Sequence, residues 1–109
     1  MGYRVELLTP EGAVRFQAER DEFILDAAKE VGCPLPATCL QGWCITCAGR
    51  LLEGEADHSQ ATRFYPQDRQ AGFVLLCCAT ACSNLKIRTH QADAMANHRA
   101  AHRLPHPRG

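Results

Sequence analysis

Four of the seven cysteines are spaced so that they could hold a metal cluster. Cys39, Cys44 and Cys47 form a C-x4-C-x2-C run, and Cys77 follows after 29 further residues. Thiolates are soft ligands that bind iron and zinc, and this spacing is typical of a [2Fe–2S] cluster with four cysteine ligands. The chemistry that such a cluster provides is the uptake and release of single electrons.

Zinc is the alternative metal for these cysteines. Structural zinc sites with four cysteines usually take their ligands from two C-x2–4-C pairs on separate turns. Only Cys44 and Cys47 make such a pair here, because the distant arm offers Cys77, Cys78 and Cys82 instead. The spacing therefore favours an iron–sulfur cluster over zinc.

The other three cysteines are Cys33, Cys78 and Cys82. An odd total of seven leaves at least one cysteine unpaired in any intramolecular disulfide scheme, which argues against a disulfide framework. We expect these three to be small buried residues, because unpaired cysteine is among the most buried residue types. The alternative is a reactive thiol that forms a disulfide or replaces a damaged ligand.

The composition indicates one globular domain. The chain has 109 residues, 46% of them hydrophobic, and a formal net charge of zero, so we expect no nucleic-acid partner. No segment approaches the roughly 18 apolar residues that span a membrane, and the amino terminus does not resemble a signal peptide. We expect a monomer without membrane insertion, in the cytoplasm or, in a eukaryote, the plastid stroma.

The apolar pattern predicts a hairpin at the amino terminus, two helices, and further strands around a loop that carries the cysteines. Residues 33–47 show neither a helical nor a strand period and form the predicted loop. The predicted extended segments are 3–9, 13–18, 48–53, 73–76 and 84–89, and the predicted helices are 23–31 and 66–71.

The last part of the chain differs in character. Residues 1–90 carry a net charge of −2, whereas residues 91–109 carry +2. We therefore expect a cluster domain over 1–90 and a basic tail rich in His, Arg and Ala over 91–109.

Three tail histidines recur every four residues, namely His98, His102 and His106. On a helix they would align as a possible metal stripe. Pro105 argues against a helix there, so we expect a flexible tail. We expect His58 and His90 to be surface residues.

Beyond the cysteines, residues 3–90 resemble the plant and cyanobacterial [2Fe–2S] ferredoxins. The similar segments are 24–28, 35–39, 47–50, 70–77 and 87–90. The resemblance implies an α+β fold of the β-grasp (ubiquitin-like) type, with a mixed sheet, one main helix and a cluster-binding loop. It also implies that Cys39 and Cys44 bind the outer iron, and that Cys47 and Cys77 bind the inner one.

The cysteine loop departs from the family pattern. It has the apolar residues Leu40 and Trp43 between the first two ligands. Ile45 occupies the position at which the family has a serine that can donate a hydrogen bond to a cluster sulfur. Fewer hydrogen-bond donors and drier surroundings both disfavour added negative charge on the cluster. We therefore expect a reduction potential at or below the plant-type value of about −400 mV. Trp43 is either a docking or shielding residue or is packed locally against Leu40.

The predicted function is one-electron transfer between a reductase or photosystem and an acceptor enzyme such as an oxygenase. No nucleophile–base pair or phosphate loop accompanies the cysteines, so we expect an electron carrier and not an enzyme. The family's acidic carboxyl-terminal residues are replaced here by the basic tail, which favours a specialised isoform. The alternative is an iron–sulfur cluster assembly or sensing protein.

Overall fold

The computed structural model describes residues 2–33, 35, 45–60 and 64–105. Within these ranges the strands are β1 (Gly2–Thr9), β2 (Gly12–Glu19), β3 (Ala48–Glu53), β4 (Ala56–Asp57), β5 (Phe73–Leu75), β6 (Thr80–Ala81) and β7 (Leu85–Arg88). The helices are α1 (Ile24–Glu30), α2 (Pro66–Gln70) and α3 (Ala92–Ala101). None of the helices in this part of the chain has the length and apolar character needed to cross a membrane.

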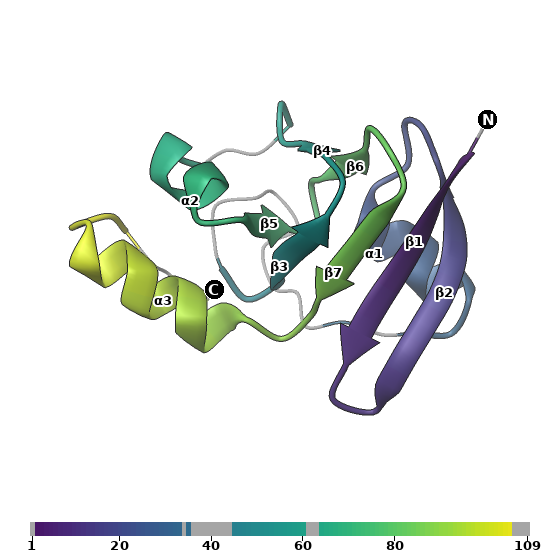
Figure 1. Ribbon diagram of the computed structural model, residues 1–109, viewed down its shortest axis with the longest axis horizontal. Coiled ribbons are helices and arrows are strands. Elements are labelled where there is room, and N and C mark those ends of the chain that lie inside the picture. The colour runs from purple at the N-terminus through teal and green to yellow at the C-terminus, as the bar shows by residue number, and fades with distance from the viewer. Residues whose placement is uncertain (1, 34, 36–44, 61–63, 106–109) are drawn as a thin grey trace.

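Five strands form one mixed sheet in the order β2-β1-β7-β3-β5. The pairing of β1 with β7 is parallel, and the other pairings are antiparallel. Helix α1 lies behind the sheet in the view of Figure 1, and β4 and β6 form a separate two-stranded ribbon. This arrangement confirms the predicted β-grasp fold.

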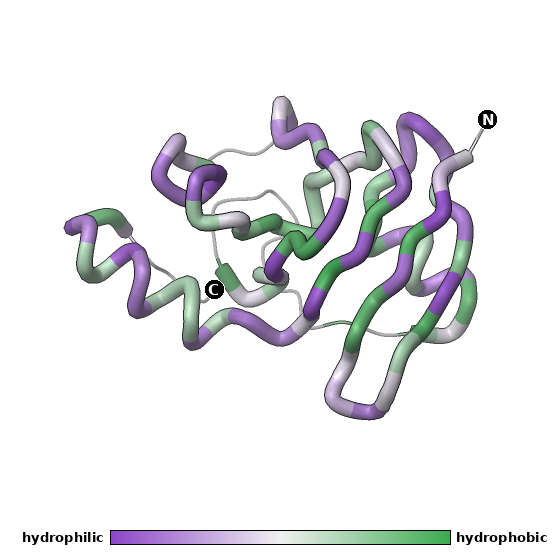
Figure 2. Tube along the Cα trace, in the orientation of Figure 1, coloured by the Kyte–Doolittle hydropathy of each residue, from purple (hydrophilic) through white to green (hydrophobic). Residues whose placement is uncertain are grey.

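The local predictions of strands and helices are confirmed in the described ranges. Apolar and polar residues alternate along β1 and β2, as Figure 2 shows, and the apolar Val5 and Leu7 are completely buried. On α1 the buried face consists of Ile24, Leu25, Ala27 and Ala28. The predicted loop at 33–47 lies mostly outside the described residues, so it stays a prediction.

Strand β3 is packed tightly between its neighbours β7 and β5. A Cβ atom added at Gly49 would lie 2.9 Å from Cγ2 of Ile87 and 3.1 Å from the carbonyl oxygen of Arg88. Glycine at this position therefore allows the close approach of β7 to the strand that begins directly after Cys47.

The expectation of a flexible tail is wrong for residues 92–101, which form helix α3. Met95 is fully buried and Ala96 is nearly so, so the helix contributes to the core. The segment is rich in alanine, the residue with the highest helix propensity, and Pro105 lies beyond the last helical residue. The division of the chain into a 1–90 domain and a 91–109 segment stays a prediction.

A buried ion pair joins α3 to α2. The guanidinium of Arg99 donates to the carboxylate of Asp68 at 2.8 and 3.4 Å, and both side chains are fully buried. Arg99 also donates to the carbonyl of Pro105, and it lies over the ring of Tyr65 at 5.0 Å. The Asp68 carboxylate accepts from the N–H of Tyr65 as well, so it caps the start of α2.

Replacing Asp68 with Ala should destabilise the protein strongly, because Arg99 would remain buried without its counter-charge. Breaking a buried pair in this way costs about 3–5 kcal/mol. The measurement is the thermal unfolding midpoint of the anaerobic holoprotein, followed by circular dichroism.

The matched control is Glu6→Ala, which removes the partner of the exposed Arg15 at 3.2 Å. Exposed pairs contribute about 0–1 kcal/mol, so this variant should unfold close to the native midpoint. Equal midpoints for the two variants would contradict the structural role assigned to the buried pair.

Candidate metal-cluster site

Two of the four predicted ligands lie in the described part of the chain, and the fold brings them together. Cys47 directly precedes β3 and Cys77 follows shortly after β5, whose residue Leu75 pairs with Ala48. The sulfur atoms of Cys47 and Cys77 lie 3.2 Å apart, and both residues are buried. Cys39 and Cys44 lie outside the described residues.

The geometry of this thiol pair fits two ligands of one tetrahedral metal. With metal–sulfur bonds of about 2.3 Å, two thiolates on one metal have sulfur atoms roughly 3.8 Å apart. The observed 3.2 Å is somewhat shorter than that separation and far longer than the roughly 2.05 Å of a disulfide bond. A small adjustment of the two side chains would therefore let both sulfurs reach the same iron.

Backbone hydrogen bonds hold the chain on either side of Cys77. The N–H of Leu76 donates to the carbonyl of Cys47 at 3.3 Å, which ties the two ligand segments together directly. The first turn of α1 donates to the same region, from Leu25 to the carbonyl of Leu76 and from Ile24 to the carbonyl of Ala79. These donors would otherwise be unpaired N–H groups at the start of a helix, so the contact satisfies both segments.

Most of the described residues close to the two cysteines in sequence are buried. Ile45, Leu76 and Cys78 are each at most 2% exposed. Low-polarity surroundings disfavour added negative charge, because little solvent or dipole compensates it. The low potential predicted from the sequence stays a prediction.

His58 contacts the segment that leads to Cys77, a contact that sequence reasoning missed. We expected a surface histidine, but the ring is half-buried, and its Nε2 accepts a hydrogen bond from the N–H of Leu75 at 3.1 Å. It also stacks on Phe64, with ring centroids 3.7 Å apart. Burial, assisted by the positive charge of Arg69, lowers the pKa of His58 to about 4.

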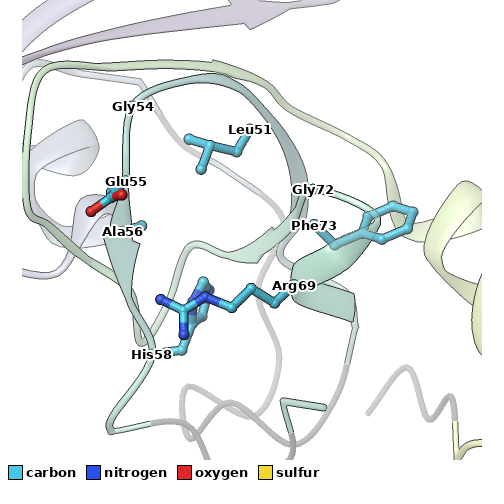
Figure 3. A pocket seen from close by; sticks show the side chains of 8 residues that line it. All are labelled: Leu51, Gly54, Glu55, Ala56, His58, Arg69, Gly72 and Phe73. Atoms are coloured by element: carbon cyan, nitrogen blue, oxygen red, sulfur yellow. The ribbon is translucent and has the colours of Figure 1, made fainter. Parts of the chain in front are cut away.

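A small pocket of about 180 Å³ opens beside this histidine. Figure 3 shows the side chains that line it, among them His58 and Arg69, which extends from α2 toward the imidazole. The other lining residues are Leu51, Gly54, Glu55, Ala56, Gly72 and Phe73. No signal in the sequence places His58 here, because the contact joins the residue after β4 to β5 across the intervening helix.

The three cysteines outside the ligand set have different environments. Cys78 is buried, as predicted, and its thiol points to the carbonyl oxygen of Leu75 at 3.5 Å. Cys82 is exposed, so the prediction of burial is wrong for it. Cys33 is half-buried, and burial together with the nearby Glu11 raises the pKa of its thiol, which keeps it protonated and weakly nucleophilic at neutral pH.

The tail histidine His98 lies on α3 and His102 directly follows the helix, with ring centroids 4.7 Å apart. His98 nevertheless faces Asp68 at 3.3 Å and packs near Phe73, as part of the α2–α3 contact. Within the described ranges, no group of three or more His, Cys, Asp or Glu side chains is placed to hold a metal ion.

A β-grasp sheet that brings buried cysteine thiols together at one edge defines a class of small metal-cluster proteins. Comparison with known families agrees, because residues 8–82 match the model of the 2Fe-2S iron-sulfur cluster binding domain. The chain belongs to this family, so its cofactor is a [2Fe–2S] cluster. Its ferredoxin relatives are electron carriers and not enzymes, and we assign this chain the same general role.

Two curated relatives illustrate the family. Ferredoxin-2 of a Synechococcus strain is 42% identical over 93 residues, which cover 85% of this chain and 89% of the relative. The chloroplastic Ferredoxin-6 of Zea mays is 35% identical over 92 residues, which cover 84% of this chain and 59% of the relative. The resemblance to plant and cyanobacterial ferredoxins is thereby confirmed.

Two solved structures share the fold as part of longer chains. Pectocin M2 has a TM-score of 0.79 and 28% identity, and the match covers 85% of this chain and 34% of that one. The Amycolatopsis cytochrome P450 reductase GcoB has a TM-score of 0.72 and 29% identity, covering 81% of this chain and 26% of that one. This chain thus spans only about a third of the pectocin and a quarter of the reductase.

Exchanging single cysteines tests the ligand set. Cys77→Ser should remove most of the iron or change the visible and electron paramagnetic resonance spectra strongly, because Cys77 is the predicted ligand on the β5 side. Cys82→Ser should leave both unchanged, and Cys78→Ser is the buried control beside the ligand. A chain that needs Cys82 and tolerates Cys77→Ser would show that the predicted ligand set is wrong.

Proposed function

We propose that this chain is a mobile one-electron carrier whose [2Fe–2S] cluster is held by Cys39, Cys44, Cys47 and Cys77. The observation that carries this assignment is the buried approach of the Cys47 and Cys77 sulfurs to 3.2 Å. The cluster supplies the uptake and return of one electron. The protein supplies the thiolates, the fixed backbone around them and the exclusion of water.

The carrier operates as a specialised isoform between a reductase or photosystem and an acceptor enzyme such as an oxygenase. Charge supports this proposal, because the carboxyl-terminal segment has a formal charge of +2, and although Arg99 is buried against Asp68, Arg103 is exposed. Exposed charges steer the encounter of redox proteins and so influence which partner binds fastest. The similarity to part of a cytochrome P450 reductase is in keeping with an oxygenase-type pathway.

We further propose that the protein acts as a monomer in the cytoplasm or, in a eukaryote, the plastid stroma. The exposed large hydrophobic side chains in the described part of the chain are Val31 and Leu52, which lie on different elements and supply no broad apolar face for a second copy. The relatives from a cyanobacterium and from a chloroplast support the proposed compartments.

An anaerobic redox titration followed by low-temperature electron paramagnetic resonance tests the function. A signal from one electron per [2Fe–2S] cluster should appear with a midpoint at or below about −400 mV, because Ile45 is buried and supplies no hydroxyl donor to the cluster. A midpoint well above this value would contradict the proposed low-potential role. A protein without iron would contradict the carrier function itself.

A further inference from the structure

The chain around Cys77 is held from three sides. The N–H of Leu76 donates to the carbonyl of Cys47, the residue before β3. The N–H of Leu25 on α1 donates to the carbonyl of Leu76. The third bond comes from His58, which accepts from the N–H of Leu75 at 3.1 Å. The first two bonds join backbone groups and persist under substitution, whereas the third depends on a side chain.

The third bond is needed because β5 is an edge strand of the five-stranded sheet. Its pairing with β3 uses one side, and the N–H of Leu75 is bonded to the His58 ring and not to a strand. Leu75 is fully buried, so without His58 its N–H would have no ready replacement partner from solvent. His58 therefore supplies the hydrogen-bond acceptor for the N–H of Leu75 at the edge of β5. Leu75 lies two residues before Cys77.

The protonation state of His58 suits this task. Only a neutral imidazole has a nitrogen that can accept a hydrogen bond. Burial, together with the positive charge of Arg69, lowers the pKa of His58 to about 4, so the ring is neutral around pH 7. Stacking on Phe64 at 3.7 Å, with an angle of 8° between the rings, fixes the direction in which Nε2 points.

We propose that His58 is a positioning residue that sets the reduction potential of the cluster by fixing the end of β5 and, through it, Cys77. The inference rests on the proposed ligand role of Cys77. Without the acceptor, the end of β5 can shift and admit water to the edge of a dry site. Water near the cluster stabilises added negative charge, so loss of the bond raises the potential.

The test compares His58→Phe with His58→Gln in the purified holoprotein. Phenylalanine keeps a ring that can stack on Phe64 but offers no acceptor, whereas the amide oxygen of glutamine can accept the bond. His102→Leu replaces an exposed histidine directly after α3 and is the control. The readouts are the midpoint from an anaerobic titration and the rate of iron release to a chelator.

For His58→Phe we expect at least a threefold higher ratio of reduced to oxidised protein at a fixed ambient potential. This change is about 28 mV, given about 59 mV per tenfold change for one electron. Iron release should also accelerate severalfold, and His58→Gln should lie near the native values for both. If His58 had only a structural role, His58→Phe would lower the thermal unfolding midpoint and leave the reduction potential unchanged.

The inference is overturned if His58→Phe keeps the native potential, or if His58→Gln shifts as far as His58→Phe. Its failure is distinct from failure of the proposed function. If the native protein holds a redox-active cluster and Cys77→Ser loses it, but His58→Phe behaves as native, only the role of His58 is wrong. If the native protein holds no cluster, the carrier function fails as well.

Discussion

The pairing of Ala48 with Leu75 is the constraint on which the candidate site depends. Cys47 and Cys77 are 30 residues apart in sequence, and they meet because β3 and β5 are held in one register of an antiparallel pair. A slip of one residue would turn every side chain of the shifted strand to the opposite face of the sheet. The close packing at Gly49 and the bonds from α1 to the segment around Cys77 both oppose such a slip. The sheet thus brings Cys47 and Cys77 to one place in the candidate site.

A second buried contact organises the part of the molecule formed by α2 and α3. The Asp68 carboxylate caps the first turn of α2 and also binds Arg99 of α3, so one side chain fixes both the start of one helix and the position of the other. Gln91 adds a backbone bond to the carbonyl of Ala48, the residue after Cys47. Helix α3 therefore packs on the end of β3 that carries a proposed ligand. The carboxyl-terminal segment is structurally coupled to the site although it contributes no cysteine.

The sequence was informative where the determinants are local. Alternation along β1 and β2, the helical period of α1 and the cysteine spacing all depend on neighbours within a few residues, and each predicts its element or its chemistry. The missed features are contacts over long sequence distances. Asp68 and Arg99 are 31 residues apart, and His58 and Leu75 are 17 apart. Each of these residue types is common on protein surfaces, so the sequence alone does not mark Asp68, Arg99 or His58 as buried. Pro105 misled the prediction for α3, because a proline just past the last turn ends a helix without preventing it.

The buried region around Cys47 and Cys77 and the exposed face of α3 differ in how freely their residues can change. Cys47, Cys77 and the backbone bonds around them lie in the β3–β5–α1 region, where most of the described residues are buried. On α3, by contrast, Met95 and Arg99 are the buried anchors, while Asp93 and Asn97 are exposed. Substitution at exposed positions alters the electric field met by an approaching partner and hardly affects a buried site, since solvent screens surface charges over about 10 Å. A helix held by a buried ion pair can therefore vary its outer face without loss of the contact that fixes its position.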